Sequence, residues 1–137
     1  MAEPNEFNKK IIDEFRANGG KVGAFAGAPM VLLTTTGARS GEASITPLVC
    51  LPDGELILVF ASKAGAPKHP GWYHNLLKNP TVTVEWGTER FQATATDITG
   101  EEHDRLYAQQ AKAFPNFAEY QKNTTRVIPV VALDRQK

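Results

Sequence analysis

The sequence has little of what marks a secreted, membrane-spanning or nucleic-acid-binding protein. It holds one cysteine, and a single thiol cannot form an internal disulfide, so nothing indicates an oxidising compartment. Its 15 basic and 15 acidic side chains cancel, whereas nucleic-acid-binding domains are usually strongly basic. The N-terminal residues lack the basic start and apolar centre of a secretory signal, and no apolar run approaches the roughly 18 residues that cross a bilayer. We therefore expect a soluble cytoplasmic protein with no nucleic-acid partner.

Motifs for catalysis by protein groups alone are also missing. There is no nucleophile elbow of the Gly-x-Ser-x-Gly type and no phosphate-binding loop of the Walker type. The histidines His69, His74 and His103 lack the spacing and the neighbouring cysteines or carboxylates of a metal site, so we expect no metal. Cys50 lies in an apolar stretch, which favours a small core residue over a reactive thiol.

The first recognisable element is an amphipathic helix. Apolar residues recur at three- and four-residue steps from Phe7 to Phe15, and a glycine pair follows, which predicts a helix over about residues 6–18. Its apolar face is narrow, which favours packing against the rest of the domain. The alternative is reversible contact with a membrane surface or a partner.

Short apolar runs with alternating polarity follow, and most are joined by turn residues. A strand ending near 51 and another starting near 55 flank the Pro-Asp-Gly turn at 52–54, which is typical of a hairpin. The sequence from Thr99 to Glu102 fits a capping box, and Pro129 within the last run suggests an edge or a bulge. We expect strands at 30–35, 45–51, 55–61, 81–86, 89–97 and 127–133, and further helices at 71–78, 99–113 and 116–121.

These elements predict a mainly β protein with helices (α+β). Strand–helix–strand alternation is absent, which argues against a doubly wound parallel sheet. Six antiparallel strands leave exposed edges unless the sheet closes on itself. With 137 residues and 42% of them hydrophobic, we expect residues 1–137 to form one domain, a six-stranded antiparallel barrel.

Two polar loops between the apolar runs could carry chemistry. The first, from Thr34 to Glu42, combines three threonine hydroxyls with Arg39, Ser40 and two glycines. Glycines let backbone N–H groups approach an oxyanion, and a guanidinium can grip one with its planar fork. The alternative is an ordinary hairpin with an exposed arginine.

The second loop supplies Ser62, Lys63 and Lys68 and then enters the helix expected from Gly71. A helix start attracts phosphate through its free N–H groups and its dipole. Trp72 and Tyr73 would add flat apolar surface beside it, as a nucleotide-like or flavin-like cofactor requires. The alternative is that Trp72 and Leu76 are core anchors, and opposite faces of one helix can serve both purposes.

The segments 33–42, 46–48, 61–80 and 125–131, together with the opening segment 15–23, resemble the deazaflavin-dependent nitroreductase family of actinobacteria, which uses coenzyme F-420. The resemblance covers nearly the whole chain. It implies a split β-barrel related to barrels that bind flavin mononucleotide (FMN). It also implies a reduced deazaflavin as hydride donor, with quinones, activated nitro compounds or enones as acceptors.

The resemblance also implies a set of site residues. The phosphate-bearing tail would meet Arg39, Ser40 and Lys63. The full set of implied cofactor-binding residues is Ala38, Arg39, Ser40, Ser44, Ile45, Thr46, Pro47, Leu48, Val49, Phe60, Ala61, Ser62, Lys63, Gly71, Trp72, Tyr73, His74, Asn75 and Phe117. Phe114, Phe117 and Tyr120 would lie on the substrate side.

The chain departs from the family pattern in two places. Ala38 stands where the family often has a cation, which predicts weaker binding of the tail. Phe114 and Phe117 replace two tyrosines of the members that activate nitro prodrugs, so only Tyr120 keeps a hydroxyl and bulky nitroimidazoles are expected to react poorly.

The mechanism expected from the resemblance is hydride transfer from the reduced deazaflavin to a stacked acceptor. Tyr120 or solvent would protonate the product, and backbone N–H groups near Ser62 would stabilise charge on the ring. Two alternatives stay open: a protein that stores the deazaflavin without turnover, and an oxidoreductase that binds FMN. A homodimer is a further expectation from the resemblance.

Overall fold

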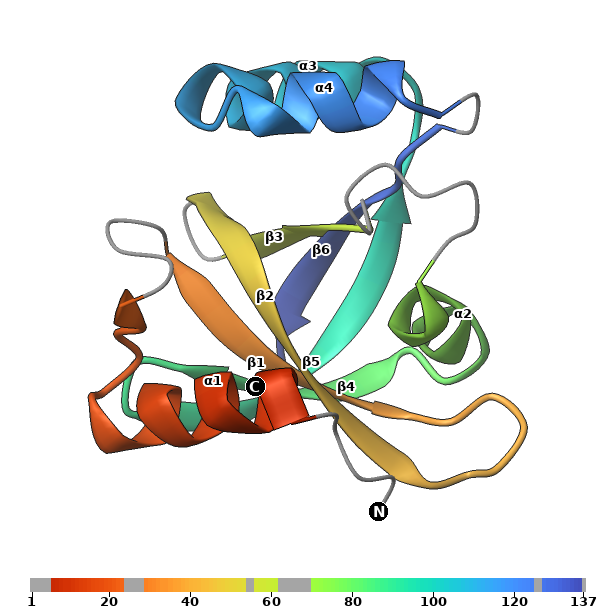
Figure 1. Ribbon diagram of the computed structural model, residues 1–137. Helices are drawn as coiled ribbons and strands as arrows, with labels where there is room; N and C mark the ends of the chain where they lie inside the picture. Colours follow the sequence, from red (N-terminus) through yellow and green to blue (C-terminus); the bar gives the residue numbers. More distant parts are fainter. Residues whose placement is uncertain (1–5, 24–28, 54–55, 62–69, 125–126, 137) are drawn as a thin grey trace.

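The computed structural model describes residues 6–23, 29–53, 56–61, 70–124 and 127–136, and in this part of the chain six strands and four helices form (Figure 1). They are α1 (Glu6–Ala17), β1 (Met30–Thr36), β2 (Ala43–Asp53), β3 (Leu56–Phe60), α2 (Gly71–Lys78), β4 (Thr81–Trp86), β5 (Glu89–Ile98), α3 (Gly100–Ala113), α4 (Asn116–Lys122) and β6 (Val130–Arg135).

The six strands form a closed antiparallel barrel in the order β1-β2-β3-β6-β5-β4, and β1 closes it by pairing with β4. Strand β2 is shared unequally between its neighbours. Its residues 43–49 pair with β1, and only Cys50 to Asp53 pair with β3. The second edge of residues 43–49 therefore has no strand partner within the described ranges. The predicted six-stranded antiparallel barrel is confirmed, and the unpaired edge of residues 43–49 is called the open edge of β2 below.

The interior of the barrel follows from the alternation of each strand. On β1, Val31 and Leu33 point into the central cluster, whereas Met30 and Leu32 point outward to a second cluster. Cys50 is fully buried in the central cluster, and burial raises the pKa of its thiol to about 12, so its core role is confirmed.

The N-terminal helix packs on the outside of the barrel, as the sequence favours. Its residues Ile11, Ile12 and Phe15 are buried against Met30 and Leu32. The part of this face formed by these three residues is therefore occupied by the barrel. Among the described helices, none has both the length and the apolar character needed to span a bilayer.

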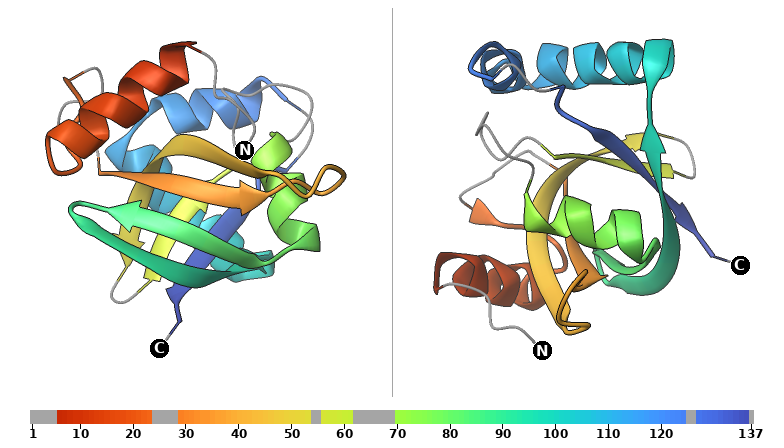
Figure 2. Two further views of the ribbon diagram at one scale, coloured as in Figure 1. Left: turned by 90° about the horizontal axis from the view of Figure 1, so that it is seen from below. Right: turned by 90° about the vertical axis from the view of Figure 1, so that its right-hand side faces the viewer.

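Helices α3 and α4 lie together on one side of the barrel, and α1 lies on the other side (Figures 1 and 2). The inner faces of α3 and α4 bury Leu106, Tyr107 and Phe117 against Leu58 and Phe60 of β3. Phe60 makes edge-to-face contacts with Tyr107 at 5.9 Å and with Phe117 at 5.7 Å between ring centroids. This aromatic cluster fixes α4 to the end of β3.

Two local predictions differ from the structure. Pro129 is not a bulge or edge residue within the last strand, because β6 begins after it at Val130; proline has no N–H for the ladder. Thr99 does precede α3, but its side chain makes no capping hydrogen bond. Gly100 has a φ of 70°, outside the helical region, so the reciprocal bonds of a capping box do not form.

Candidate functional site

The loop between β1 and β2 is a compact turn closed by its own hydrogen bonds. The Gly37 N–H donates to the Glu42 carbonyl at 2.8 Å, and the Gly41 N–H donates to the Gly37 carbonyl at 3.0 Å. The Glu42 N–H donates to Ser40 Oγ at 3.1 Å. A Cβ at position 37 would lie 2.4 Å from Ser40 Oγ, so a larger residue there would displace the Ser40 hydroxyl. Gly41 has a φ of 72°, which also favours glycine.

The side chain of Asn75 attaches the turn to α2. Its Oδ1 accepts a hydrogen bond from the Ala38 N–H at 3.0 Å, and its Nδ2 donates to Thr35 Oγ1 at 3.1 Å. Figure 2 shows the tip of the β1–β2 hairpin beside α2. The two polar loops that the sequence singled out therefore meet, through the helix that follows the second loop.

Between the turn and the helix lies a pocket of about 620 Å³, which we call the loop–helix pocket. It is lined by Gly37, Ala38, Arg39, Ser40, Glu42, Ser44, Gly71, His74 and Asn75. All of these except Gly37 and Glu42 belong to the cofactor-binding residues implied by the resemblance.

The pocket is rich in hydrogen-bond donors. The N–H groups of Arg39 and Ser40 have no acceptor among the described residues, and the Arg39 side chain is exposed. Helix α2 starts after Pro70 with no acidic side chain in its first turn, so the positive end of its dipole is not neutralised there. The carboxylate of Glu42 is the opposing charge. The arrangement suits an anion held by backbone amides and one guanidinium.

The other face of α2 belongs to the core. Trp72 and Leu76 are buried in the central cluster, which confirms the core-anchor interpretation for both. The Tyr73 hydroxyl donates to Asp97 Oδ2 of β5 at 3.0 Å, and burial together with this bond raises the pKa of Tyr73 to about 12. Tyr73 lines a separate cavity of about 370 Å³ with Asp97 and His103.

The predicted residues on β2 are divided between its two faces. Leu48 packs against the interior cluster, whereas Ile45 and Val49 pack on the side of α1. All six residues from Ser44 to Val49 are half-buried. A ligand along the open edge of β2 would therefore meet the backbone of Ile45 and Val49 rather than their side chains.

The remaining predicted residues gather at the end of β3. Phe60 and Ala61 are buried there, and Phe117 contacts both Phe60 and Tyr120. Phe114 is half-buried against the same cluster, and the Tyr120 hydroxyl accepts a hydrogen bond from Asn116 Nδ2 at 2.8 Å. Ser62 and Lys63 lie outside the described residues.

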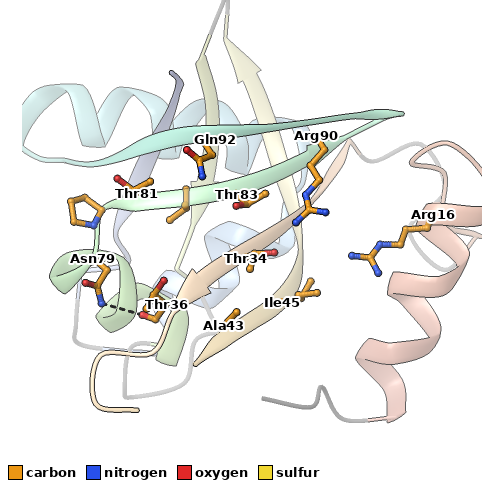
Figure 3. A pocket seen from close by; sticks show the side chains of 12 residues that line it. Arg16, Thr34, Thr36, Ala43, Ile45, Asn79, Thr81, Thr83, Arg90 and Gln92 are labelled. Carbon is orange, nitrogen blue, oxygen red and sulfur yellow. Dashed lines mark hydrogen bonds between the residues drawn. The ribbon is translucent and has the colours of Figure 1, made fainter. Parts of the chain in front are cut away.

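A larger groove on the outside of the barrel was not anticipated from the sequence (Figure 3). It measures about 790 Å³, and Figure 3 shows Arg16 of α1 and Arg90 of β5 extending toward the same end of it. The register places Ile45, Thr34, Thr83 and Gln92 in one row across four strands. The outward threonines of β1 and β4 recur at every second position, which is the signal that could have revealed it. Of the predicted cofactor residues, Ile45 alone lines this groove.

Comparison with known proteins gives one consistent result. Residues 8–135 match the model of a family described as F420H2-dependent quinone reductase, in which F420H2 denotes reduced coenzyme F-420. The chain is 40% identical over 129 residues to an F420H2-dependent quinone reductase of Mycobacterium tuberculosis, covering 89% of this chain and 85% of that relative.

Solved structures agree with the sequence matches. A structure described as an F420H2-dependent reductase is 42% identical to this chain and has a TM-score of 0.71. The match covers 77% of this chain and 94% of the chain in that structure. A structure described as a domain-swapped dimer is 36% identical and has a TM-score of 0.73. The match covers 96% of this chain and 100% of the chain in that structure. A protein of the pyridoxamine 5'-phosphate oxidase type from Listeria innocua, at 14% identity and a TM-score of 0.58, shares the fold. The predicted split barrel of the FMN-binding type is thereby confirmed.

Proposed function

Since the chain belongs to the F420H2-dependent quinone reductase family, we propose that it is an oxidoreductase that reduces quinones with reduced coenzyme F-420 and holds the anionic tail of the coenzyme in the loop–helix pocket. The observation that carries the placement is the hydrogen bond from the Ala38 N–H to Asn75, which joins the two polar segments around one pocket. Nitroaromatic compounds and enones are further acceptors that we propose from the resemblance.

The residues of the pocket fit the tail of such a coenzyme. A phosphate needs several donors at once, and the N–H groups of Arg39 and Ser40 and the Arg39 guanidinium are available. Arg39 is the one arginine or lysine among the described residues that line the pocket, and Ala38 contributes no charge. The open edge of β2 offers backbone donors and acceptors to the polar rim of a flat ring, and Phe60 with Phe117 offers an apolar wall nearby.

When bound, the reduced coenzyme supplies the hydride, and the protein supplies position and electrostatics. Arg39 and the turn would hold the anionic end of the coenzyme, which would restrict its motion at that end. The buried ring of Phe117 excludes water on the side of α4. The Tyr120 hydroxyl accepts a hydrogen bond from Asn116, which leaves its own proton free for the reduced product.

The test is a titration of the purified protein with reduced deazaflavin, oxidised deazaflavin and FMN, followed by turnover with menadione. We expect binding of the deazaflavin and loss of its reduced form only when both protein and menadione are present. Binding without turnover would favour a storage protein. Purified protein that is yellow with tightly bound flavin would favour the FMN alternative.

We also propose that a second copy of the chain is a partner. The similarity to a domain-swapped dimer over nearly the whole chain supports this. Light scattering coupled to size-exclusion chromatography would then give about twice the chain mass of 15.0 kDa, and a mass near 15.0 kDa at working concentrations would refute the dimer.

A further inference from the structure

Asn75 lies on α2 and faces the turn 37–42, and both polar atoms of its carboxamide are hydrogen-bonded within the protein. We propose that Asn75 is a positioning residue: it holds the turn 37–42 in the conformation that leaves two adjacent N–H groups free for an anion. The inference rests on the proposed function, because the anion is taken to be the tail of the coenzyme.

The orientation of the Asn75 amide is fixed by its partners. The Ala38 N–H can only donate, so Oδ1 must face it, and Nδ2 must face the Thr35 hydroxyl. Thr35 is 1% exposed and belongs to β1, which is anchored by pairing with β2 and β4. The position of Asn75 is thus set by a buried strand residue, and Asn75 in turn sets the position of Ala38.

The hydrogen bonds of the turn show which of its N–H groups are already used within the protein. The N–H groups of Gly37, Gly41 and Glu42 are used by acceptors within the turn, and that of Ala38 is used by Asn75. Those of Arg39 and Ser40 remain without an acceptor among the described residues. Loss of the Asn75 acceptor would free the Ala38 end of the turn, so that ordering the turn around an anion would cost additional conformational entropy.

Thr35 allows the Asn75 amide to be disturbed without a change to the pocket lining. Asn75 lines the loop–helix pocket, so its removal alone would not distinguish the two. Thr35 is buried and does not line the pocket, yet it holds Nδ2 in place. A change at Thr35 therefore tests whether the orientation of the Asn75 amide matters for binding, without removing any group from the pocket.

The experiment measures the Kd for reduced deazaflavin, the KM for menadione and kcat at saturating deazaflavin. The variants are Asn75→Ala, Thr35→Val and Thr35→Ser. Asn79→Ala is the matched control: Asn79 lies one helical turn further along, donates to the Thr36 carbonyl at 3.4 Å and does not line the pocket. Thermal unfolding of each variant is recorded alongside.

We expect Asn75→Ala and Thr35→Val to raise the Kd for the deazaflavin about three- to tenfold, as loss of one neutral hydrogen bond implies, with kcat and the KM for menadione unchanged. Thr35→Ser keeps the acceptor and should bind like the wild type, as should Asn79→Ala. A wild-type Kd in Thr35→Val, or no rescue by Thr35→Ser, would overturn the inference. If Asn75→Ala does not fold, the two Thr35 variants decide alone.

The two levels of the proposal can fail separately. Absence of deazaflavin binding by the wild-type protein would refute the proposed function. Binding by the wild type with equal affinity in Asn75→Ala and Thr35→Val would refute only the positioning role.

Discussion

Gln110 offers a sharp test of the energetics of α3. It lies on the buried face of the helix with Leu106 and Tyr107, and it is 0% exposed. Neither its Nε2 nor its Oε1 has a hydrogen-bond partner among the described residues. A buried amide without partners is a cost to folding, because both groups lose their bonds to water and gain none in return. We therefore predict that Gln110→Met stabilises the protein.

The magnitude follows from the desolvation of the amide. A buried polar group left unsatisfied costs about 1–3 kcal/mol, and methionine has nearly the same shape with no group to satisfy. We expect the free energy of unfolding to rise by about 1–3 kcal/mol. For a chain of 137 residues, one kcal/mol corresponds to about 3–5 °C in Tm, so the Tm should rise by about 3–15 °C.

Urea unfolding and differential scanning calorimetry measure both quantities. Gln109→Met is the matched control, because Gln109 is the exposed neighbour on the same helix and its replacement should change the Tm by about one degree or less. A Gln110→Met variant that is equally stable or less stable than the wild type would show that the amide is satisfied in solution. The desolvation argument would then be wrong for this residue.

Three further predictions concern the site and the pH dependence. Gly37→Ala should raise the KM for the deazaflavin several-fold, because a Cβ 2.4 Å from Ser40 Oγ forces that side chain away from the Glu42 N–H. The increase should be smaller in a Ser40→Ala background, where the clash is absent. Additive effects of the two substitutions on KM would contradict this explanation. Glu42→Gln should lower the same KM about twofold at low ionic strength, since it removes the opposing charge from the pocket, and the gain should vanish in high salt. Burial raises the pKa of Cys50 from 9.0 to about 12 and that of Tyr73 from 10.0 to about 12. Between about pH 9 and 12 the unfolded chain therefore binds fewer protons than the folded chain, and the free energy of unfolding falls as pH rises. Cys50→Ala should make this fall less steep in urea titrations at several pH values, and an unchanged slope would count against the shift at Cys50.

Most helices and strands of this protein can be predicted from the sequence, because turn residues and alternating polarity mark them locally. The helix α2 begins at Gly71 and ends at Lys78 as expected from Pro70 and the Asn-Pro pair after it, and β4 matches its alternating run. The split of β2 was not readable in the same way. Its length of 11 residues reflects pairing with β1 and then with β3, and such pairing depends on contacts far apart in the sequence.

The candidate site was predictable in composition but not in connectivity. The donors of the first loop and the helix start of the second were evident, and the resemblance joined them to one ligand. That Asn75 binds the Ala38 N–H and the Thr35 hydroxyl could not be deduced, because these partners lie 37 and 40 residues away. Trp72 and Tyr73 are buried among core residues, as a flat aromatic side chain favours, and their place beside the cofactor stays a prediction.

The place of the site follows from the unequal lengths of the strands. Strand β3 has 5 residues and β2 has 11, so the first part of β2 cannot be covered by β3, and the β1–β2 hairpin continues past the point where the ladder with β3 ends. A projecting hairpin end needs another element to order it, because fewer ladder hydrogen bonds hold it. Helix α2 is that element, because Asn75 accepts the hydrogen bond of the Ala38 N–H in the turn. The end of the hairpin and the helix that orders it therefore enclose one pocket, in which the N–H groups of Arg39 and Ser40 have no acceptor among the described residues.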